Sequence, residues 1–173
     1  MTLHGEIRNL AAAREKIGDR QLLLITGLGG SGKSTLATRL ARKLETYGFL
    51  PIPLSSSKEN PLSSARLLQS FGDAFRESAR NYESEGDLKM AGKLDALVRD
   101  LKKPDFSVED RLNDAVSAMN RGRFLLLLDN FESNLGEEDL RILDPEISLF
   151  YRYLMENLSG SSRAIITTRY LPS

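Results

Sequence analysis

The sequence has no cysteine and only one histidine, His4, among its 173 residues. Without cysteine there is no disulfide framework and no thiolate metal site. A single histidine near the N-terminus argues against a histidine-based zinc site and against a Ser-His-Asp triad. The 24 basic residues balance 24 acidic ones, so the formal net charge is zero. We therefore do not expect nucleic acid or an anionic membrane to be the main partner.

Long apolar runs are also missing. No stretch approaches the length of a membrane span, and no signal-peptide pattern opens the chain. We expect a cytoplasmic protein with no membrane partner. The length is that of one domain with a sizeable core. The sequence stops a few residues after its last expected strand, so we also expect it to be a fragment of a larger protein.

The most informative motif is Gly-Leu-Gly-Gly-Ser-Gly-Lys-Ser-Thr at residues 27–35, which fits the phosphate-loop pattern Gly-x4-Gly-Lys-[Ser/Thr]. The five apolar or β-branched residues before it, 22–26, have the length of a strand. The residues after it, 36–44, have leucines at helical spacing. Strand, glycine loop and helix form the context that such a motif requires.

The residue types in this motif suit the binding of phosphate. Glycines allow positive φ and remove Cβ atoms, so that backbone N–H groups can surround an anion, and the following helix adds its positive dipole end. We expect Lys33 to reach the β- and γ-phosphates, Ser34 to ligate Mg²⁺ and Thr35 to lie near the α-phosphate. The predicted nucleotide-binding residues are Gly27, Gly29, Gly30, Ser31, Gly32, Lys33, Ser34 and Thr35.

A second stretch, 123–130, combines an unbroken apolar run with an acid at its end. Continuous apolar residues from Phe124 to Leu128 predict a central parallel strand that is covered on both faces. Asp129 then lies where ligands bind in open α/β sheets, the place of a Walker B aspartate that shares Mg²⁺ with Ser34. The alternative role for Asp129 is to cap the following turn.

The remaining pattern completes an α/β domain. An N-terminal segment, 1–19, contains a predicted amphipathic helix that packs on the sheet or contributes to the nucleotide site. A strand at 49–54 contains two prolines at alternate positions, which places it at a sheet edge. Residues 62–103 are predicted to form a helical insertion before a further helix that Ser107 caps. This insertion either packs on the sheet or acts as a lid or partner surface.

The C-terminal part supplies one more charged candidate. A helix that starts near Pro145 and stops at Gly160 precedes a last strand at 163–168. Arg169 follows directly, at the same sheet edge as the phosphate loop if the strand is parallel. There it is either a γ-phosphate ligand or a solvated charge at a strand end.

Together these segments resemble the STAND class of P-loop NTPases, of the NB-ARC type. The matching segments are 27–37, the run Phe-Leu-Leu-Leu-Leu-Asp-Asn-Phe-Glu at 124–132 and Ser-Arg-Ala-Ile-Ile-Thr-Thr-Arg at 162–169. The resemblance implies a three-layer α/β domain with a parallel sheet of about four strands in the order 2-3-4-1. It also implies C-terminal domains, beyond residue 173, that close over the nucleotide, and an oligomer of the full-length protein. The run at 124–132 looks most like bacterial multidomain regulators.

Two departures from that pattern concern nucleotide contacts and hydrolysis. Glu6 stands where relatives often have an arginine that helps to hold the nucleotide. Asn130 stands where many have a second acid, and an amide cannot accept a proton as a base. Glu132 is the nearest acid that can replace it if the turn brings it toward the γ-phosphate.

We therefore expect a P-loop domain over residues 1–173 that binds ATP or ADP with Mg²⁺ and hydrolyses ATP slowly. It would be the switch module of a signalling or defence regulator. The predicted catalytic residues are Lys33, Asp129, Glu132 and Arg169, and the predicted metal ligands are Ser34 and Asp129. Because no guanine-reading Asn-Lys-x-Asp occurs, adenine is favoured. The alternatives are a binding module with negligible turnover and a P-loop small-molecule kinase.

Overall fold

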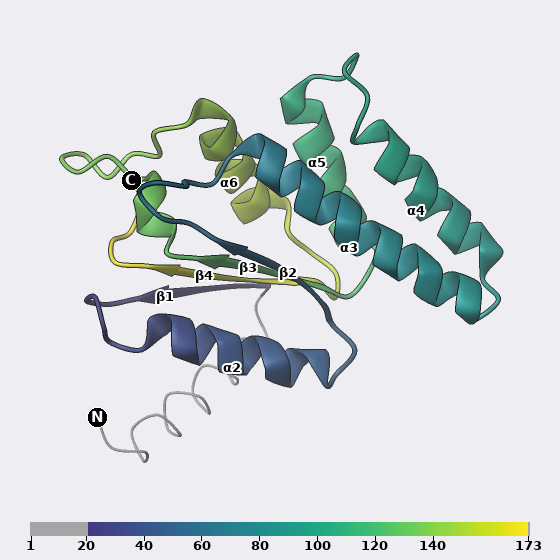
Figure 1. The fold of residues 1–173 in the computed structure, drawn as a ribbon, viewed down its shortest axis with the longest axis horizontal. Helices are drawn as coiled ribbons and strands as arrows, with labels where there is room; N and C mark the ends of the chain where they lie inside the picture. Colours follow the sequence, from purple (N-terminus) through teal and green to yellow (C-terminus); the bar gives the residue numbers. More distant parts are fainter. Residues whose placement is uncertain (1–20, 173) are drawn as a thin grey trace.

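The computed structural model describes residues 21–172, and these form a four-stranded parallel sheet flanked by helices (Figure 1). The strands are β1 (Leu22–Thr26), β2 (Leu50–Ser55), β3 (Phe124–Asp129) and β4 (Arg163–Thr168), in the spatial order β1-β4-β3-β2. This is the predicted order 2-3-4-1 read from the other edge, so the fold prediction is confirmed. The N-terminal helix expected within 1–19, with Glu6, lies outside the described residues.

The two prolines of β2 are accommodated because this strand is at the edge of the sheet. In the register with β3, Pro51 is opposite Leu125 and Pro53 is opposite Leu127. A proline has no N–H to donate to a ladder, so one side of such a strand cannot take a second partner. The edge position that the prolines predicted is therefore confirmed.

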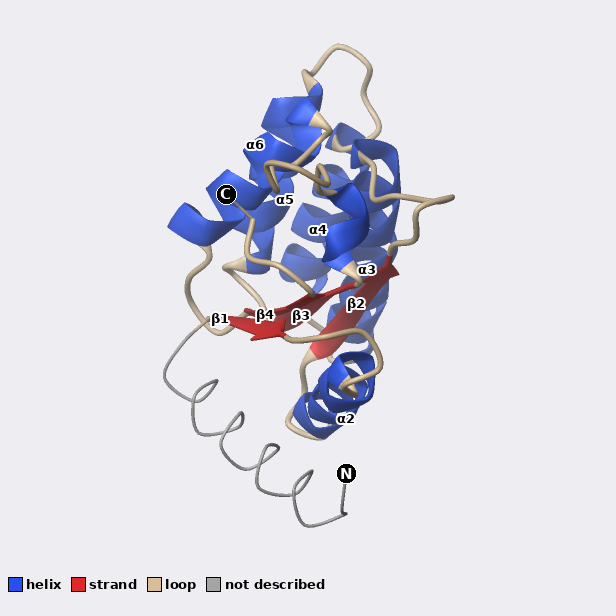
Figure 2. Ribbon diagram, turned by 90° about the vertical axis from the view of Figure 1, so that its left-hand side faces the viewer, coloured by secondary structure: helices blue, strands red, loops and turns tan. Residues whose placement is uncertain are grey.

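Helices cover both faces of the sheet, which gives three layers (Figure 2). Helix α2 (Lys33–Glu45) lies on one face. Helices α3 (Ser64–Ser84), α5 (Val108–Met119) and α6 (Pro145–Asn157) lie on the other, and α4 (Leu88–Asp100) packs on α3. Three helices thus separate β2 from β3, where one would close a parallel crossover.

The central strands separate two apolar clusters because their side chains alternate between faces. Leu125 of β3 and Ile165 of β4 pack with Ala37, Leu40 and Ala41 of α2. The next side chains along the same strands join a larger cluster beneath α3, α5 and α6, which contains fully buried Phe71, Phe75 and Phe150. This double coverage explains why β3 reads as one continuous apolar run.

Capping side chains fix the helix starts as the sequence predicts. The Ser107 hydroxyl accepts a hydrogen bond from the Asp110 amide at 3.0 Å and donates one to the Asp110 carboxylate at 2.7 Å. At α6 the Asp144 carboxylate caps the helix, and Pro145 occupies its first turn. At α5 the Asp110 carboxylate contacts the Ser107 hydroxyl, whereas a full capping box would take the Ser107 backbone N–H.

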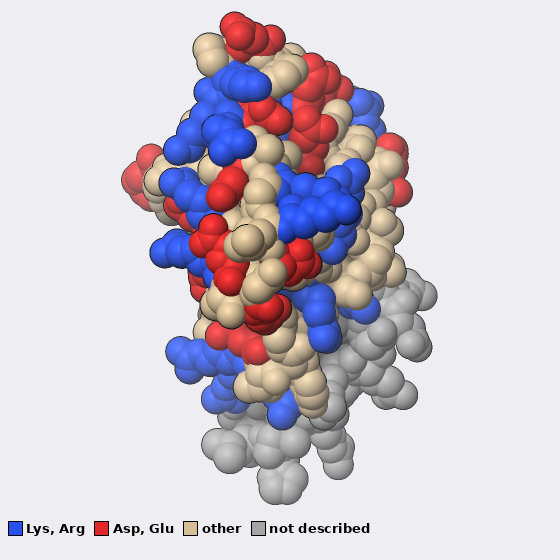
Figure 3. All heavy atoms as spheres, turned by 90° about the vertical axis from the view of Figure 1, so that its right-hand side faces the viewer, with Lys and Arg blue, Asp and Glu red and all other residues tan. Residues whose placement is uncertain are grey.

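The visible surface mixes charges of both signs. On the face shown in Figure 3, basic and acidic side chains are interspersed rather than segregated. None of the helices within residues 21–172 combines the length and the apolar character that crossing a membrane requires.

Candidate nucleotide site

The phosphate loop joins β1 to α2 through glycines in left-handed conformations. Gly30 has a φ of 75° and Gly32 a φ of 84°, values that favour glycine. Gly32 is also the N-cap of α2, and its carbonyl accepts from the Leu36 amide at 2.9 Å. No acidic residue occupies the first turn of α2, so no side chain of that turn neutralises the positive end of the helix dipole. The phosphate loop and the start of α2 therefore form a site that suits an anion.

Lys33 holds the loop in its present shape. Its ammonium group donates to the carbonyl oxygens of Gly27 at 2.7 Å and Leu28 at 2.9 Å, and the residue is only 9% exposed. The positive charge is therefore already placed at the centre of the loop. The Ser34 side chain at the start of α2 is half-buried, whereas Thr35 is exposed.

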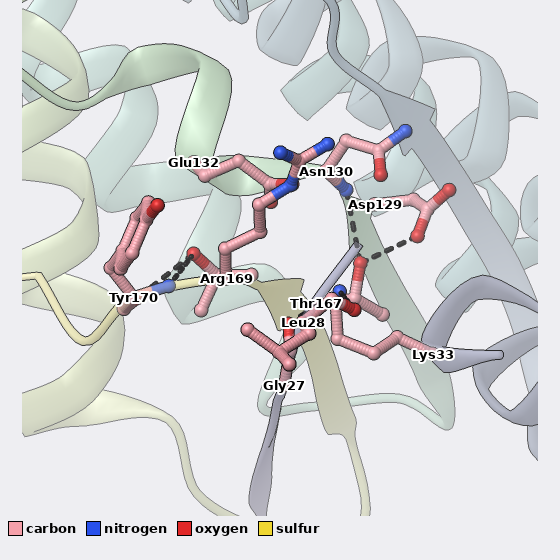
Figure 4. A network of polar contacts seen from close by, with 10 residues as sticks. Gly27, Leu28, Lys33, Asp129, Asn130, Glu132, Thr167, Arg169 and Tyr170 are labelled. Carbon is pink, nitrogen blue, oxygen red and sulfur yellow. Dashed lines mark hydrogen bonds and ion pairs between the residues drawn. The ribbon is translucent and has the colours of Figure 1, made fainter. Parts of the chain in front are cut away.

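Asp129 is fixed by a threonine from the neighbouring strand. The Thr167 hydroxyl donates to the Asp129 carboxylate at 2.5 Å and accepts from the Asn130 amide at 3.0 Å (Figure 4). Thr167 is fully buried, so this hydroxyl has no access to water. Asn130 has a φ of 58° and starts the turn after β3. The sequence alone does not single out Thr167, although it belongs to the Thr-Thr-Arg segment.

Glu132 and Arg169, both predicted from the sequence, contact each other. The Nε of Arg169 lies 3.0 Å from Oε1 of Glu132. The same guanidinium lies over the phosphate loop, because a Cβ added to Gly29 would come within 3.3 Å of its Cζ and Nη2 atoms. The turn after β3 thus brings Glu132 back toward the loop, and Arg169 connects the two.

The turn itself is anchored by a buried asparagine that the sequence pattern does not reveal. The turn, η1 (Phe131–Asn134), is a short 3-10 helix. Oδ1 of Asn134 accepts from the Leu62 amide at 2.7 Å, and its Nδ2 donates to the Phe131 carbonyl at 3.1 Å and to Ser56 at 3.3 Å. In the sequence this residue reads as part of an exposed acidic loop, since its partners at 56 and 62 are distant along the chain.

The donor atoms present suit Mg²⁺ bound together with a nucleotide. Magnesium prefers hard oxygen ligands and usually takes one or two from protein, with phosphates and water completing its shell. The Asp129 carboxylate and the Ser34 hydroxyl are such oxygens, at the end of β3 and the start of α2. The donor set therefore fits the metal that the sequence predicts.

Comparison with known proteins identifies the family. Residues 4–159 match the AAA ATPase domain. The chain belongs to this family. This AAA ATPase domain is also similar to the signal recognition particle 54 kDa proteins of Methanococcus maripaludis strains C5 and S2. Identity to each is 21% over 155 residues, which cover 83% of the chain and 34% of each relative. The chain thus spans about a third of the length of these curated relatives. Membership of the family implies that the domain binds a nucleotide.

The AAA ATPase domain also has an open cavity of about 730 Å³ between the segments that follow β2, β3 and β4. Glu132 and Arg169 form one part of its wall, and Lys58 and Glu137 form another. The Lys58 ammonium, 2.8 Å from the Glu137 carboxylate, lowers the pKa of Glu137 through their hydrogen bond and charge interaction, which also raise the pKa of Lys58. Both groups are exposed, so this pair adds little to stability.

Proposed function

We propose that this domain binds Mg-ATP, hydrolyses it slowly and serves as the nucleotide-dependent switch of a signalling or defence regulator of the STAND class, NB-ARC type. One observation carries the proposal. The phosphate loop, Arg169 and Asp129 lie at the C-terminal ends of three adjacent parallel strands, β1, β4 and β3, at the same edge of the sheet: the first two follow their strands directly, and Asp129 is the last residue of β3. That edge is where open α/β sheets bind ligands.

The proposed roles follow from the chemistry of each side chain. Loop N–H groups and the α2 dipole would hold the phosphates, and the Lys33 ammonium would exchange loop carbonyls for phosphate oxygens. Ser34 and Asp129 would hold Mg²⁺, whose charge would stabilise the transferring phosphoryl group. Arg169, 54% exposed and beside Gly29, would contact the γ-phosphate.

Slow hydrolysis is supported by the side chains at the end of β3. Asn130 has an amide, which cannot take a proton from water. Glu132 has a carboxylate, but its Oε1 is paired with Arg169 at 3.0 Å and its Oε2 is buried, so neither oxygen faces open water in this arrangement. The same pairing favours the second candidate, a nucleotide-binding module with negligible turnover.

The regulator role rests on the three sequence segments and their order. We propose that the full-length protein continues into C-terminal domains that close over the nucleotide, and that it forms an oligomer. The absence of a guanine-reading Asn-Lys-x-Asp from the whole sequence supports ATP over GTP. The signal and the effector would belong to other parts of the protein.

Isothermal titration with Mg-ATP tests nucleotide binding in the Lys33→Ala and Asp129→Asn variants. We expect Lys33→Ala to weaken binding about 100-fold, because two charged phosphate contacts are lost. Asp129→Asn should weaken binding only when Mg²⁺ is present. Lys43→Ala, on the same helix away from the loop, is the matched control. Equal affinities of Lys33→Ala and Lys43→Ala would refute the site.

A single-turnover assay of ATP hydrolysis tests the proposal that the domain hydrolyses ATP slowly. We expect a rate below about 1 s⁻¹, the lower end of ordinary enzyme turnover. If Glu132→Gln leaves a measurable rate unchanged, Glu132 is not the base. Screening small-molecule acceptors in the same assay covers the kinase alternative, and phosphate transfer that outpaces hydrolysis would favour it.

A further inference from the structure

The Glu132 carboxylate is held in place with one charged partner, Arg169, among the described residues. Asn134 anchors its turn, and the adjacent Phe131 is fully buried and stacks on Tyr151 with ring centroids 5.4 Å apart. The Glu132 side chain is 14% exposed. Its Oε1 contacts Arg169, whereas its Oε2 is buried and has no hydrogen-bond partner within residues 21–172. Burial of an unsatisfied carboxylate oxygen is costly, so this group depends on the guanidinium.

Arg169 is the more exposed member of the pair. Its side chain is 54% exposed, and the residue directly follows the C-terminal end of β4. Its guanidinium also lies against Gly29 of the phosphate loop. A guanidinium can donate hydrogen bonds to a carboxylate or to a phosphate, and the γ-phosphate of a bound triphosphate carries more negative charge than one carboxylate. A diphosphate has no γ-phosphate to offer.

We propose that Glu132 is a specificity-determining residue that competes with the γ-phosphate of ATP for Arg169 and thereby lowers the preference of the domain for ATP over ADP. This inference rests on the proposed nucleotide function. In the ADP-bound protein Arg169 stays on Glu132. In the ATP-bound protein Arg169 moves to the γ-phosphate and leaves both Glu132 oxygens free to accept hydrogen bonds. The ion pair therefore distinguishes the two nucleotide states within the domain itself.

The first test compares affinities for Mg-ADP and for the non-hydrolysable Mg-AMP-PNP by isothermal titration. Glu132→Gln keeps the shape of the side chain and removes the charge that holds Arg169. We expect its affinity for Mg-AMP-PNP to rise about tenfold, because binding no longer has to break one charged hydrogen bond. Its affinity for Mg-ADP should be unchanged. Glu138→Gln removes an acid from the wall of the same cavity and should leave the ratio of affinities as it is. An unchanged ratio in Glu132→Gln overturns the inference.

A double-mutant cycle shows whether Glu132 acts through Arg169. With Arg169→Ala in place, adding Glu132→Gln should no longer change the ratio of Mg-AMP-PNP to Mg-ADP affinity. If the ratio still rises about tenfold, the effect is one of general charge near the phosphates, and the competition is refuted.

Nitrogen-15 NMR of the unsubstituted protein gives an independent measurement if a variant fails to fold. The Nε–H resonance of Arg169 should shift with Mg-AMP-PNP and stay in place with Mg-ADP. Equal spectra in the two complexes would contradict the proposal. A protein that binds neither nucleotide would instead refute the proposed function, so the two failures are distinguishable.

Discussion

The Thr167 hydroxyl gives the sharpest quantitative test of the site. Thr167→Val keeps the size and branching of the side chain but removes the hydroxyl that contacts Asp129 and Asn130. A hydrogen bond to a charged group is worth about 1.5–3 kcal/mol, and the partly buried Asn130 N–H left unpaired adds to the loss. Because Asp129 is only half-buried and can regain water, we expect the free energy of unfolding to fall by about 2–3 kcal/mol.

Thr167→Ser is the matched control, because it keeps the hydroxyl and loses one methyl group. Its cost should be about 1 kcal/mol. Urea unfolding with linear extrapolation measures both variants. The binding assay separates stability from function. Thr167→Val should weaken Mg-ATP binding several-fold because Asp129 loses its fixed orientation, whereas the affinities of the two variants should agree in EDTA.

An unfolding free energy of Thr167→Val equal to that of the unsubstituted protein would refute this reasoning, since the hydroxyl would then contribute nothing. A second check is the cycle of Thr167→Val with Asp129→Ala. Residues in direct contact typically show a coupling energy of about 0.5–3 kcal/mol. A coupling energy near zero would mean that Thr167 and Asp129 contribute independently, against the short contact between them.

Three further predictions concern other parts of the chain. Asn134→Ala should lower the unfolding free energy by about 2–4 kcal/mol in urea, since three buried hydrogen bonds are lost, and should slow single-turnover hydrolysis if the turn positions an active Glu132. Ser162→Ala breaks a buried hydroxyl network at the opposite end of β4, so it should cost about 2 kcal/mol in the same measurement and leave Mg-ATP affinity unchanged. Gly29→Ala places a methyl group 3.3 Å from the Arg169 guanidinium, so titration should show weaker Mg-AMP-PNP binding with Mg-ADP binding little changed.

The strands, the helices and the edge position of β2 were predictable because their signals are local or periodic, whereas the strand order 2-3-4-1 was implied by the family resemblance. The apolar run of β3, the prolines of β2 and the glycines of the phosphate loop each restrict the backbone wherever they occur. A parallel sheet then places the ends of its strands at one edge, which brings the phosphate loop, Asp129 and Arg169 to the same part of the molecule. No long-range contact had to be known in advance for these predictions.

The connections between the site residues could not be predicted in the same way. Thr167 contacts Asp129 across 38 positions, and Asn134 contacts Leu62 across 72. Nothing in the local sequence distinguishes the buried Asn134 from a solvated loop residue. The Glu132–Arg169 pair likewise depends on the direction in which a four-residue turn leaves β3.

These long-range contacts also bear on the proposal that the site binds a nucleotide and hydrolyses it slowly. The groups expected to bind phosphate or metal are held in place before any ligand arrives, with Lys33 on the loop carbonyls and Asp129 on Thr167. Glu132, the acid proposed as a base, has its charge engaged by Arg169. Binding therefore starts from groups that are already in position, and in the proposed competition the arriving γ-phosphate draws Arg169 away from Glu132 before hydrolysis. A site with that order of events responds to the presence of the γ-phosphate before it removes it, which is the behaviour that a switch requires.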